Sequence, residues 1–243
     1  MSIEHIVKKN GIPWSAMSTA IGIMLMMTAT VWWVYPAALI LALLQKRWIR
    51  IGRLHVFNPS NFAVVVTITL LPHKAHIVVG QLGNAYWVGI MVLFLALAVL
   101  YRVHRWIIPI VFFTFYAAMY YWWLIPLEIT MRFEDVLTAW SSVSFLVFSL
   151  FMLTDPVTTP RSSFGQVLFA SCVATVAVFT DVLWGIRTVH LFEALFITSA
   201  LATIVRPGLA RRERLKAIAI SIGAIIVIMT LEFQSPYYFA MDG

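Results

Sequence analysis

The sequence has few charged residues. Asp, Glu, Lys and Arg together make up only 11% of its 243 residues, whereas 62% are hydrophobic and 14% are aromatic. A soluble domain has about a quarter of its residues charged, so too few polar side chains remain here to cover a surface that faces water. The composition excludes a soluble enzyme and predicts an integral membrane protein surrounded mainly by membrane lipids.

Cysteine is nearly absent as well. The single residue, Cys172, lies inside an apolar run. One thiol excludes an internal disulfide, a thiolate metal cage and a cysteine-ligated iron–sulfur cluster built from this chain alone. The sequence also lacks a Gly-rich nucleotide loop and a nicotinamide site, so a redox role would need electrons from a partner chain. No cleavable signal pattern is expected, because residues 1–13 are polar and the first apolar run continues into a second.

The apolar runs predict an all-α, polytopic membrane protein that forms a single integral membrane domain over residues 1–243. We expect about nine crossings, one or two of them short or broken, over residues 14–30, 31–44, 60–71, 87–101, 106–123, 136–153, 164–180, 189–204 and 217–231. Residues 14–44, with Tyr35-Pro36 as a turn or kink, are interpreted as two helices, and one bent helix is the alternative. The run closed by Pro72 rises only about 18 Å. It is either a half-helix or a helix continued irregularly through Ile77–Gly80.

Basic residues occur in short clusters between the apolar runs, which is typical of cytoplasmic loops and not of a nucleic-acid-binding face. We therefore expect no nucleic-acid partner. With a cytoplasmic N-terminus in a bacterial inner membrane, the loops assigned outside hold only Lys74, Arg132 and Arg187 of the 17 Lys and Arg residues. If residues 14–44 formed one helix, only the N-terminus would change sides. This topology places Asn58-Pro59 and Asp155-Pro156 on the same, cytoplasmic face.

Two passages combine a side chain that caps helices with a following proline. They are Arg53–Phe62, which contains Asn58-Pro59, and Phe151–Pro160, which contains Asp155-Pro156. Proline suits the first helical position, so we expect Asn58 and Asp155 to cap helices that begin near Pro59 and after Pro156. Capping alone explains each passage. The alternative is a ligand site, because a helix N-terminus offers N–H donors and a partial positive charge to an electron-rich ligand.

Side chains beside the two passages suit a heteroaromatic ligand. Hydroxyl and amide groups can bond a ring edge, and Phe57, Phe62 and Phe151 can supply ring contacts. A membrane-soluble redox cofactor, either a flavin or a quinone, fits such a site. The predicted cofactor-binding residues are Asn58, Pro59, Ser60, Asn61, Phe62, Thr154, Asp155, Pro156 and Thr158. No catalytic residue is assigned.

The same passages carry a family resemblance. Gly52-Arg53 followed by Phe57–Ser60 resembles the G-R-x-x-F-N-P-A helix entry of the RnfD/NqrB family of membrane electron-transfer subunits. Phe151–Val157, with Gly165 nine residues after Pro156, resembles that family's F-M-x-T-D-P-V passage and its downstream glycine. The resemblance extends over about residues 40–205. The short chain and its H-x-F-N-P-S-N wording are most similar to the UnbU-like branch of the family.

The resemblance implies a subunit that passes electrons through flavin within a larger membrane complex. In the family, the Asn-Pro passage lies near a non-covalent riboflavin, which carries over to Asn58, Pro59 and Asn61. Larger members attach a covalent FMN to a threonine within S-G-A-T, a motif that this sequence lacks, so only a non-covalent flavin (riboflavin or FMN) or a quinone is expected. The alternative functions are a structural subunit without cofactor and a channel or transporter for small solutes.

Three acidic residues lie in or beside the apolar runs. Glu193 lies in the run over residues 189–204, where an acid needs a partner or a proton, and we expect it to pair with Arg187 or His190. A proton or cation relay is the alternative role. Asp181 and Glu232 are interpreted as residues at helix boundaries.

The remaining histidines give little support for a metal or haem. His73 and His76 have the i, i+3 spacing of helical ligands, but no carboxylate follows nearby. His55 and His104 do not form a paired pattern across two long spans. The sequence therefore predicts no metal site.

Overall fold

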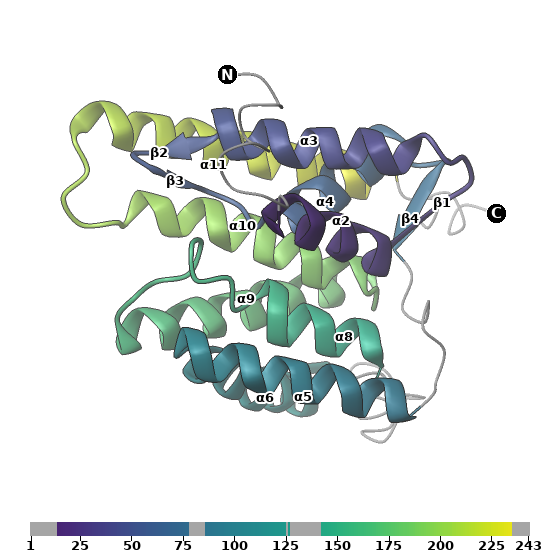
Figure 1. Ribbon diagram of the computed structural model, residues 1–243. Helices are drawn as coiled ribbons and strands as arrows, with labels where there is room; N and C mark the ends of the chain where they lie inside the picture. The colour runs from purple at the N-terminus through teal and green to yellow at the C-terminus, as the bar shows by residue number, and fades with distance from the viewer. Residues whose placement is uncertain (1–13, 78–85, 125, 127–141, 235–243) are drawn as a thin grey trace.

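Helices pack in layers in the computed structural model, which describes residues 14–77, 86–124, 126 and 142–234 (Figure 1). Parts of the sequence predictions, including the cytoplasmic N-terminal segment and residues 78–80 and 136–141, lie outside these ranges. The described helices are α2 Trp14–Met26, α3 Val34–Trp48, α4 Pro59–Leu70, α5 Tyr86–Val103, α6 Ile107–Met119, α8 Val143–Val147, α9 Ser163–Trp184, α10 Val189–Ile204 and α11 Arg211–Phe233. Two π-helical segments, η1 Tyr120–Leu124 and η2 Phe148–Met152, continue α6 and α8.

Residues 14–48 form two helices, as expected, and not one bent helix. The short strand β1 Met27–Ala29 and a turn separate α2 from α3. Tyr35 and Pro36 lie in the first turn of α3 and not between the helices. Proline is tolerated there because the first helical N–H groups need no partner within the helix.

The short helix α4 lies at the centre of the fold. It packs against α2 and α3 on one side and against α10 and α11 on the other, while α9 packs between α10 and α6. Nearly every α4 side chain is buried, including the polar Ser60, Asn61 and Thr67. A helix that is apolar all round is expected to be buried in this way. The packing therefore surrounds the Asn58-Pro59 entry with protein.

The half-helix interpretation of residues 60–71 is confirmed for the described residues. The helix stops at Leu70, because a residue that precedes proline, here Leu71, is disfavoured in the α region. The chain then turns into strand β4 Ala75–Ile77, which pairs antiparallel with β1. Ladder hydrogen bonds thus satisfy backbone groups that lipid would leave unpaired. The sequence analysis did not foresee either strand.

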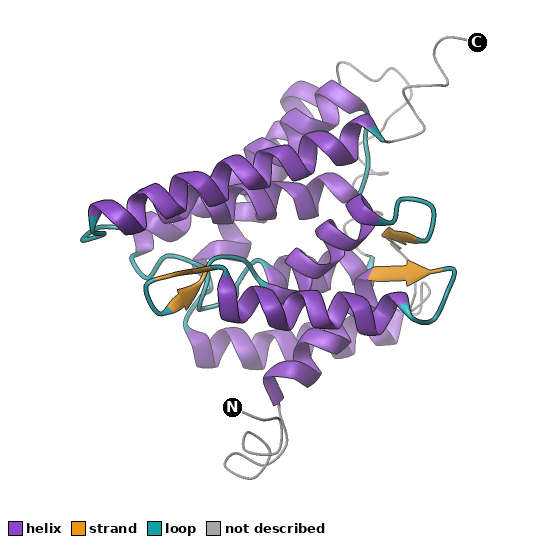
Figure 2. Ribbon diagram, turned by 90° about the horizontal axis from the view of Figure 1, so that it is seen from above, coloured by secondary structure: helices purple, strands orange, loops and turns teal. Residues whose placement is uncertain are grey.

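A second strand pair lies at the opposite end of the bundle (Figure 2). Strands β2 Arg50–Ile51 and β3 Leu54–His55 form a hairpin whose turn contains Gly52 with φ of +63°. Glycine adopts this conformation without steric cost, as the two-residue turn requires. The Gly52 N–H donates to Glu213 Oε2 at 3.2 Å, which ties the hairpin to the start of α11.

Asp155 does not cap a helix, so that expectation is wrong. Its Oδ1 accepts from Val157 N, and its carbonyl accepts from the N–H groups of Thr158 and Thr159, which closes a single turn. The turn cannot extend, since Pro160 has no N–H and disfavours the α region for the residue before it. Helix α9 begins later, at Ser163, with Ser162 as its cap.

Large apolar side chains cover the outside of the bundle. Trp87 and Phe94 on α5 are each 70% exposed, and Phe233 on α11 is 73% exposed. Helices α9 and α11 are long and apolar enough to cross a membrane, and five shorter described helices are also apolar. Such a surface suits lipid and not water.

Candidate functional site

A cavity of about 700 Å³ lies where the two proline passages meet. Asn58, Pro59 and Ser60 line it from the start of α4, and Asp155 and Pro156 line it from the loop before α9. Helix α2 forms another wall, and apolar side chains of α5 and η2 complete it, including Val92, Leu95, Phe151 and Met152. The cavity thus has a polar side and an apolar side.

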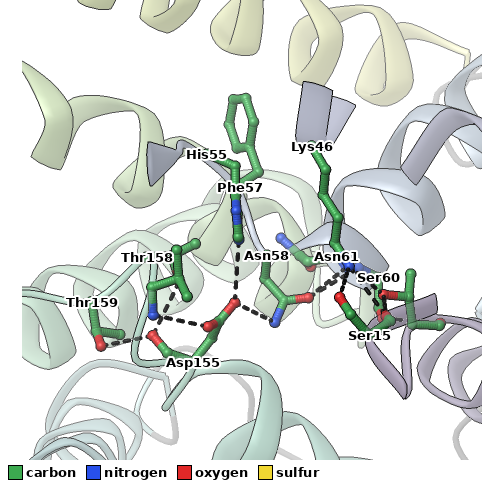
Figure 3. A network of polar contacts seen from close by, with 12 residues as sticks. Ser15, Lys46, His55, Phe57, Asn58, Ser60, Asn61, Asp155, Thr158 and Thr159 are labelled. Atoms are coloured by element: carbon green, nitrogen blue, oxygen red, sulfur yellow. Dashed lines mark hydrogen bonds and ion pairs between the residues drawn. The ribbon is translucent and has the colours of Figure 1, made fainter. Parts of the chain in front are cut away.

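Asn58 joins the two passages. Its Oδ1 accepts from the backbone N–H groups of Ser60 at 3.0 Å and Asn61 at 3.1 Å, so it caps α4 as expected. Its Nδ2 donates to Asp155 Oδ2 at 3.3 Å and to Met152 O at 3.4 Å (Figure 3). The prediction that both passages lie at the same end of the bundle is therefore confirmed.

His55 and Asp155 leave an unfilled polar position at the cavity. His55 Nε2 is 4.0 Å from Asp155 Oδ2, too far for a hydrogen bond. Although Nε2 is buried, it has no hydrogen-bond partner among the described residues. Both residues line the cavity. A polar ligand atom between them would therefore satisfy a buried nitrogen that the chain leaves unpaired.

Basic groups lie at the cavity rim. Lys46 Nζ donates to the hydroxyls of Ser15 at 2.8 Å and Thr19 at 3.0 Å, which ties the end of α3 to α2. Arg50 Nε donates to Lys46 O at 2.6 Å. With the N-terminus of α4, these two cations make the rim favourable for an electron-rich ligand.

The α2 wall depends on the close approach of two helices. Ser60 Oγ donates to Thr19 O at 3.1 Å. A Cβ atom added to Gly22 would lie only 2.6 Å from Ser60 Oγ. Because Gly22 has no side chain, α2 can contact α4 closely, and this contact sets the position of the cavity wall.

The π-helical turns of η2 supply the facing wall. Leu153 N donates to Phe148 O at 2.9 Å, an i to i−5 bond that widens the helix at this point. Phe151 and Met152 of this segment line the cavity, and the Met152 carbonyl accepts from Asn58. Single π turns are frequent at functional sites because they change which side chains and carbonyls face inward.

Four residues of the predicted set do not line the cavity. Asn61 is buried, and its Nδ2 donates to Phe192 O on α10 at 3.1 Å. Phe62 packs against Phe57 and Phe196. Thr154 Oγ1 donates to Leu150 O, and Thr158 is buried beside the Asp155 carbonyl. These residues support the loop and helix from behind.

The sequence analysis assigned no role at this site to His55, Ser15, Thr19, Gly22 or Lys46. His55 lies within the first passage, close to Asn58 in the sequence, and this closeness could have indicated that it belongs to the site. The residues of α2 belong to no motif, and only the fold places them at the cavity.

A second polar cluster lies at the start of α10, where His190 is close to Asp181 of α9 and Glu232 of α11. Arg187 Nη2 donates to Glu232 and contacts His190. Neither Glu193 oxygen has a hydrogen-bond partner among the described residues, so the expected pairing of Glu193 with Arg187 or His190 is not found there. Asp181 and Glu232 lie near the ends of α9 and α11, as boundary residues would, but both are buried.

Comparison with protein families identifies the chain. A family model described as the NQR2, RnfD, RnfE family matches residues 68–207, which is more than half of the sequence. The chain belongs to the NQR2, RnfD, RnfE family. The match includes Thr154-Asp155-Pro156 but begins after Asn58-Pro59. A comparison with curated proteins found no match.

Membership in the NQR2, RnfD, RnfE family agrees with the apolar helices. The chain is an integral membrane protein of a family whose members are subunits of multi-subunit membrane complexes. This bears out the expected RnfD/NqrB resemblance at the level of the family.

Proposed function

We propose that the chain is an electron-transfer subunit that binds a non-covalent flavin, or alternatively a quinone, in the cavity between Asn58 and Asp155. One observation carries the proposal. The two passages, nearly a hundred residues apart, meet through the bond of 3.3 Å from Asn58 Nδ2 to Asp155 Oδ2 at the edge of one cavity. Helix capping requires Asn58 alone and does not explain this contact.

The cavity fits such a ligand in size and chemistry. Its volume of about 700 Å³ lies within the usual range for small-molecule sites. Phe151, Val92 and Leu95 offer an apolar surface to a ring system, while His55 and Asp155 offer polar atoms at one edge. The buried His55 Nε2 without a partner is the clearest place for a ring oxygen or nitrogen.

The residues around the cavity have separate roles in this proposal. A bound flavin or quinone supplies the electron-carrying chemistry. Asn58 holds the Asp155 carboxylate in position, 4.0 Å from His55 Nε2, so that the carboxylate and the imidazole can bind one polar atom of the ligand between them. His55 Nε2 can give that atom a hydrogen bond or a proton. Lys46 and Arg50 favour added negative charge at the rim. Without S-G-A-T, the chain has no covalent FMN anchor of the family type.

The proposal also covers the membrane topology, the partner subunits and the branch of the family. The chain crosses a bacterial inner membrane about nine times, with its N-terminus and both proline passages on the cytoplasmic side. Partner subunits deliver and remove the electrons. The wording His55–Asn61 supports a place in the UnbU-like branch of the family.

Cofactor analysis of the intact complex tests the proposal. The complex is purified from native membranes, extracted with acid and organic solvent, and analysed by flavin fluorescence and by mass spectrometry for quinones. We expect about one flavin or quinone per chain, reduced at least tenfold in Asp155→Asn and His55→Leu, because each variant weakens a polar contact to the ligand.

A matched control separates binding from folding. Thr158→Val changes a residue of the same loop that does not line the cavity, so it should retain its cofactor. A folded complex that contains neither flavin nor quinone would overturn the proposal and favour a structural subunit. Solute flux in proteoliposomes that depends on Asn58, without any bound chromophore, would favour a transporter.

A further inference from the structure

We propose that His190, Glu193 and Glu232 bind a divalent metal ion of the zinc type. The three side chains are buried, and one ligand atom from each lies within 4.8 Å of the other two. His190 and Glu193 are three residues apart on α10 and therefore share a face, which Glu232 meets from the end of α11. This site lies outside the cavity assigned to the redox ligand and does not depend on that assignment.

The proton on His190 can be placed from its neighbours. Arg187 Nη2 lies 2.8 Å from His190 Nε2, and a guanidinium can only donate, so Nε2 must be the acceptor. The ring proton therefore lies on Nδ1, which is 2.5 Å from Asp181 Oδ1. In this tautomer the Nε2 lone pair lies on the side of Arg187 and Glu232, whose Oε1 is 3.6 Å from Nε2.

Asp181 is held in the position of an outer-sphere carboxylate. Besides His190 Nδ1, it accepts from the Arg187 backbone N–H at 3.2 Å and from Tyr120 Oη at 3.2 Å. A carboxylate that fixes the tautomer and direction of a histidine is the usual support of a metal-binding imidazole. The arrangement positions Nε2 as a ligand before any ion arrives.

The cluster contains more acidic than basic groups. Among the described residues it contains three carboxylates, those of Asp181, Glu193 and Glu232, against the single guanidinium of Arg187 and a neutral imidazole. With all three carboxylates ionised and His190 neutral, two negative charges would be uncompensated in a buried position, where isolated charges are costly. One divalent cation would compensate both.

Glu193 is an independent indication that an ion binds in this cluster. Its side chain is 0% exposed, and neither carboxylate oxygen has a hydrogen-bond partner within the part of the chain that the structure describes. Glu232 Oε1, which faces the same space, also lacks one. Imidazole nitrogen and carboxylate oxygen bind zinc at about 2.0–2.2 Å, which holds ligand atoms up to about 4 Å apart. Side-chain shifts below about an ångström would therefore complete the coordination.

Arg187 lies where the ion would enter. It contacts His190 Nε2 and Glu232 Oε2, and its side chain is 18% exposed, so it can withdraw to the surface when the metal takes its place. A metal and Arg187 thus compete for Nε2.

Metal titration of the purified full-length protein tests the site. After dialysis against a chelator, the protein in detergent is titrated with Co²⁺, read by visible absorption, and with Zn²⁺, read by elemental analysis. We expect about one ion per chain, and a loss of affinity of about 10- to 100-fold in Asp181→Asn, with larger losses in Glu193→Gln and His190→Gln. Zn²⁺ should raise the Tm of the wild type but not that of Glu193→Gln.

Two controls exclude surface binding and misfolding. Glu213→Gln alters a carboxylate paired with Lys216 at the surface, and a His73→Gln/His76→Gln double variant removes two histidines outside the cluster; both should bind as the wild type does. Glu193→Gln removes one uncompensated charge without changing shape, so its metal-free form should fold. The proposal is overturned if the wild type takes up no stoichiometric metal, or if folded Glu193→Gln binds metal with unchanged affinity.

Discussion

The two polar regions of this membrane protein differ in how they are built. The cavity at the Asn58 end is roomy, has a basic rim and is lined by loops and helix ends. The cluster around His190 is closed and consists of side chains near the ends of α9 and α11 and at the start of α10. A roomy site can lose one contact and still fold, whereas a closed cluster transmits every change to the packing. Mutations should therefore affect ligand binding mainly at the first region and stability mainly at the second.

The largest effect is expected from Arg187→Met. Removing the guanidinium leaves the buried Glu232 carboxylate without its ion-pair partner, which should lower the free energy of unfolding by about 3 kcal/mol. Thermal or denaturant unfolding in detergent measures the change. The double variant Arg187→Met/Glu232→Gln should recover most of the loss, and failure to do so would show that the ion pair is not the cause.

Asn58→Leu should have the next largest effect. The variant loses the two cap bonds to Ser60 N and Asn61 N as well as the bonds to Asp155 and Met152. We expect a destabilisation of about 2 kcal/mol together with loss of the bound cofactor. Asn58→Asp keeps the cap acceptor but repels Asp155, so it should retain more stability than Asn58→Leu while still losing cofactor. Equal stability of the two variants would contradict this account.

Gly22→Ala tests the contact between α2 and α4. The added methyl would lie 2.6 Å from Ser60 Oγ, so either Ser60 rotates and loses its bond to Thr19 O or the helices separate, at an expected cost of about 1–2 kcal/mol. Gly223→Ala on α11 is the matched control, because nothing lies within 4 Å of its added carbon. It should be neutral or slightly stabilising, since alanine favours helix over glycine. Equal Tm changes for the two variants would argue against a close approach at Gly22.

Thr158→Val should have the smallest effect. Its hydroxyl makes one long bond of 3.4 Å to the Asp155 carbonyl, which the backbone N–H groups of Thr158 and Thr159 also contact. We expect a change below about 0.5 kcal/mol and an unchanged cofactor content. A large loss of cofactor in this variant would mean that the loop, and not the cavity lining, determines binding.

The helices were largely predictable from apolar runs and proline. The expected bounds of α10 agree with the structure, and Pro72 correctly marked the end of the α4 segment. The helix expected after Pro156 does not form because a second proline follows in the same passage. Pro160, four residues later, ends that turn and moves the helix start to Ser163. A capping motif predicts a turn, but its continuation depends on the residues that follow.

The site was predictable in part because its motif residues are local in sequence. Asn58 and Asp155 could be found from their prolines, whereas Gly22 and Thr19 of α2 reach the cavity only through the packing of α2 on α4. The His190 cluster could not be assembled from the sequence, since its members lie on three helices whose rotation about their axes is set by tertiary contacts. A single acid such as Glu193 signals a buried charge but does not identify its neighbours.

The β1–β4 ribbon constrains how the chain enters the membrane during synthesis. Strand β1 leaves the ribosome directly after α2, but its hydrogen-bonding partner, β4, follows only after α3, the β2–β3 hairpin and α4 have been made. Until then, the backbone groups of residues 27–29 have no partner from this ladder, which lipid cannot replace. Insertion of α2 and α3 is therefore coupled to the arrival of α4, and these three helices should leave the translocon together.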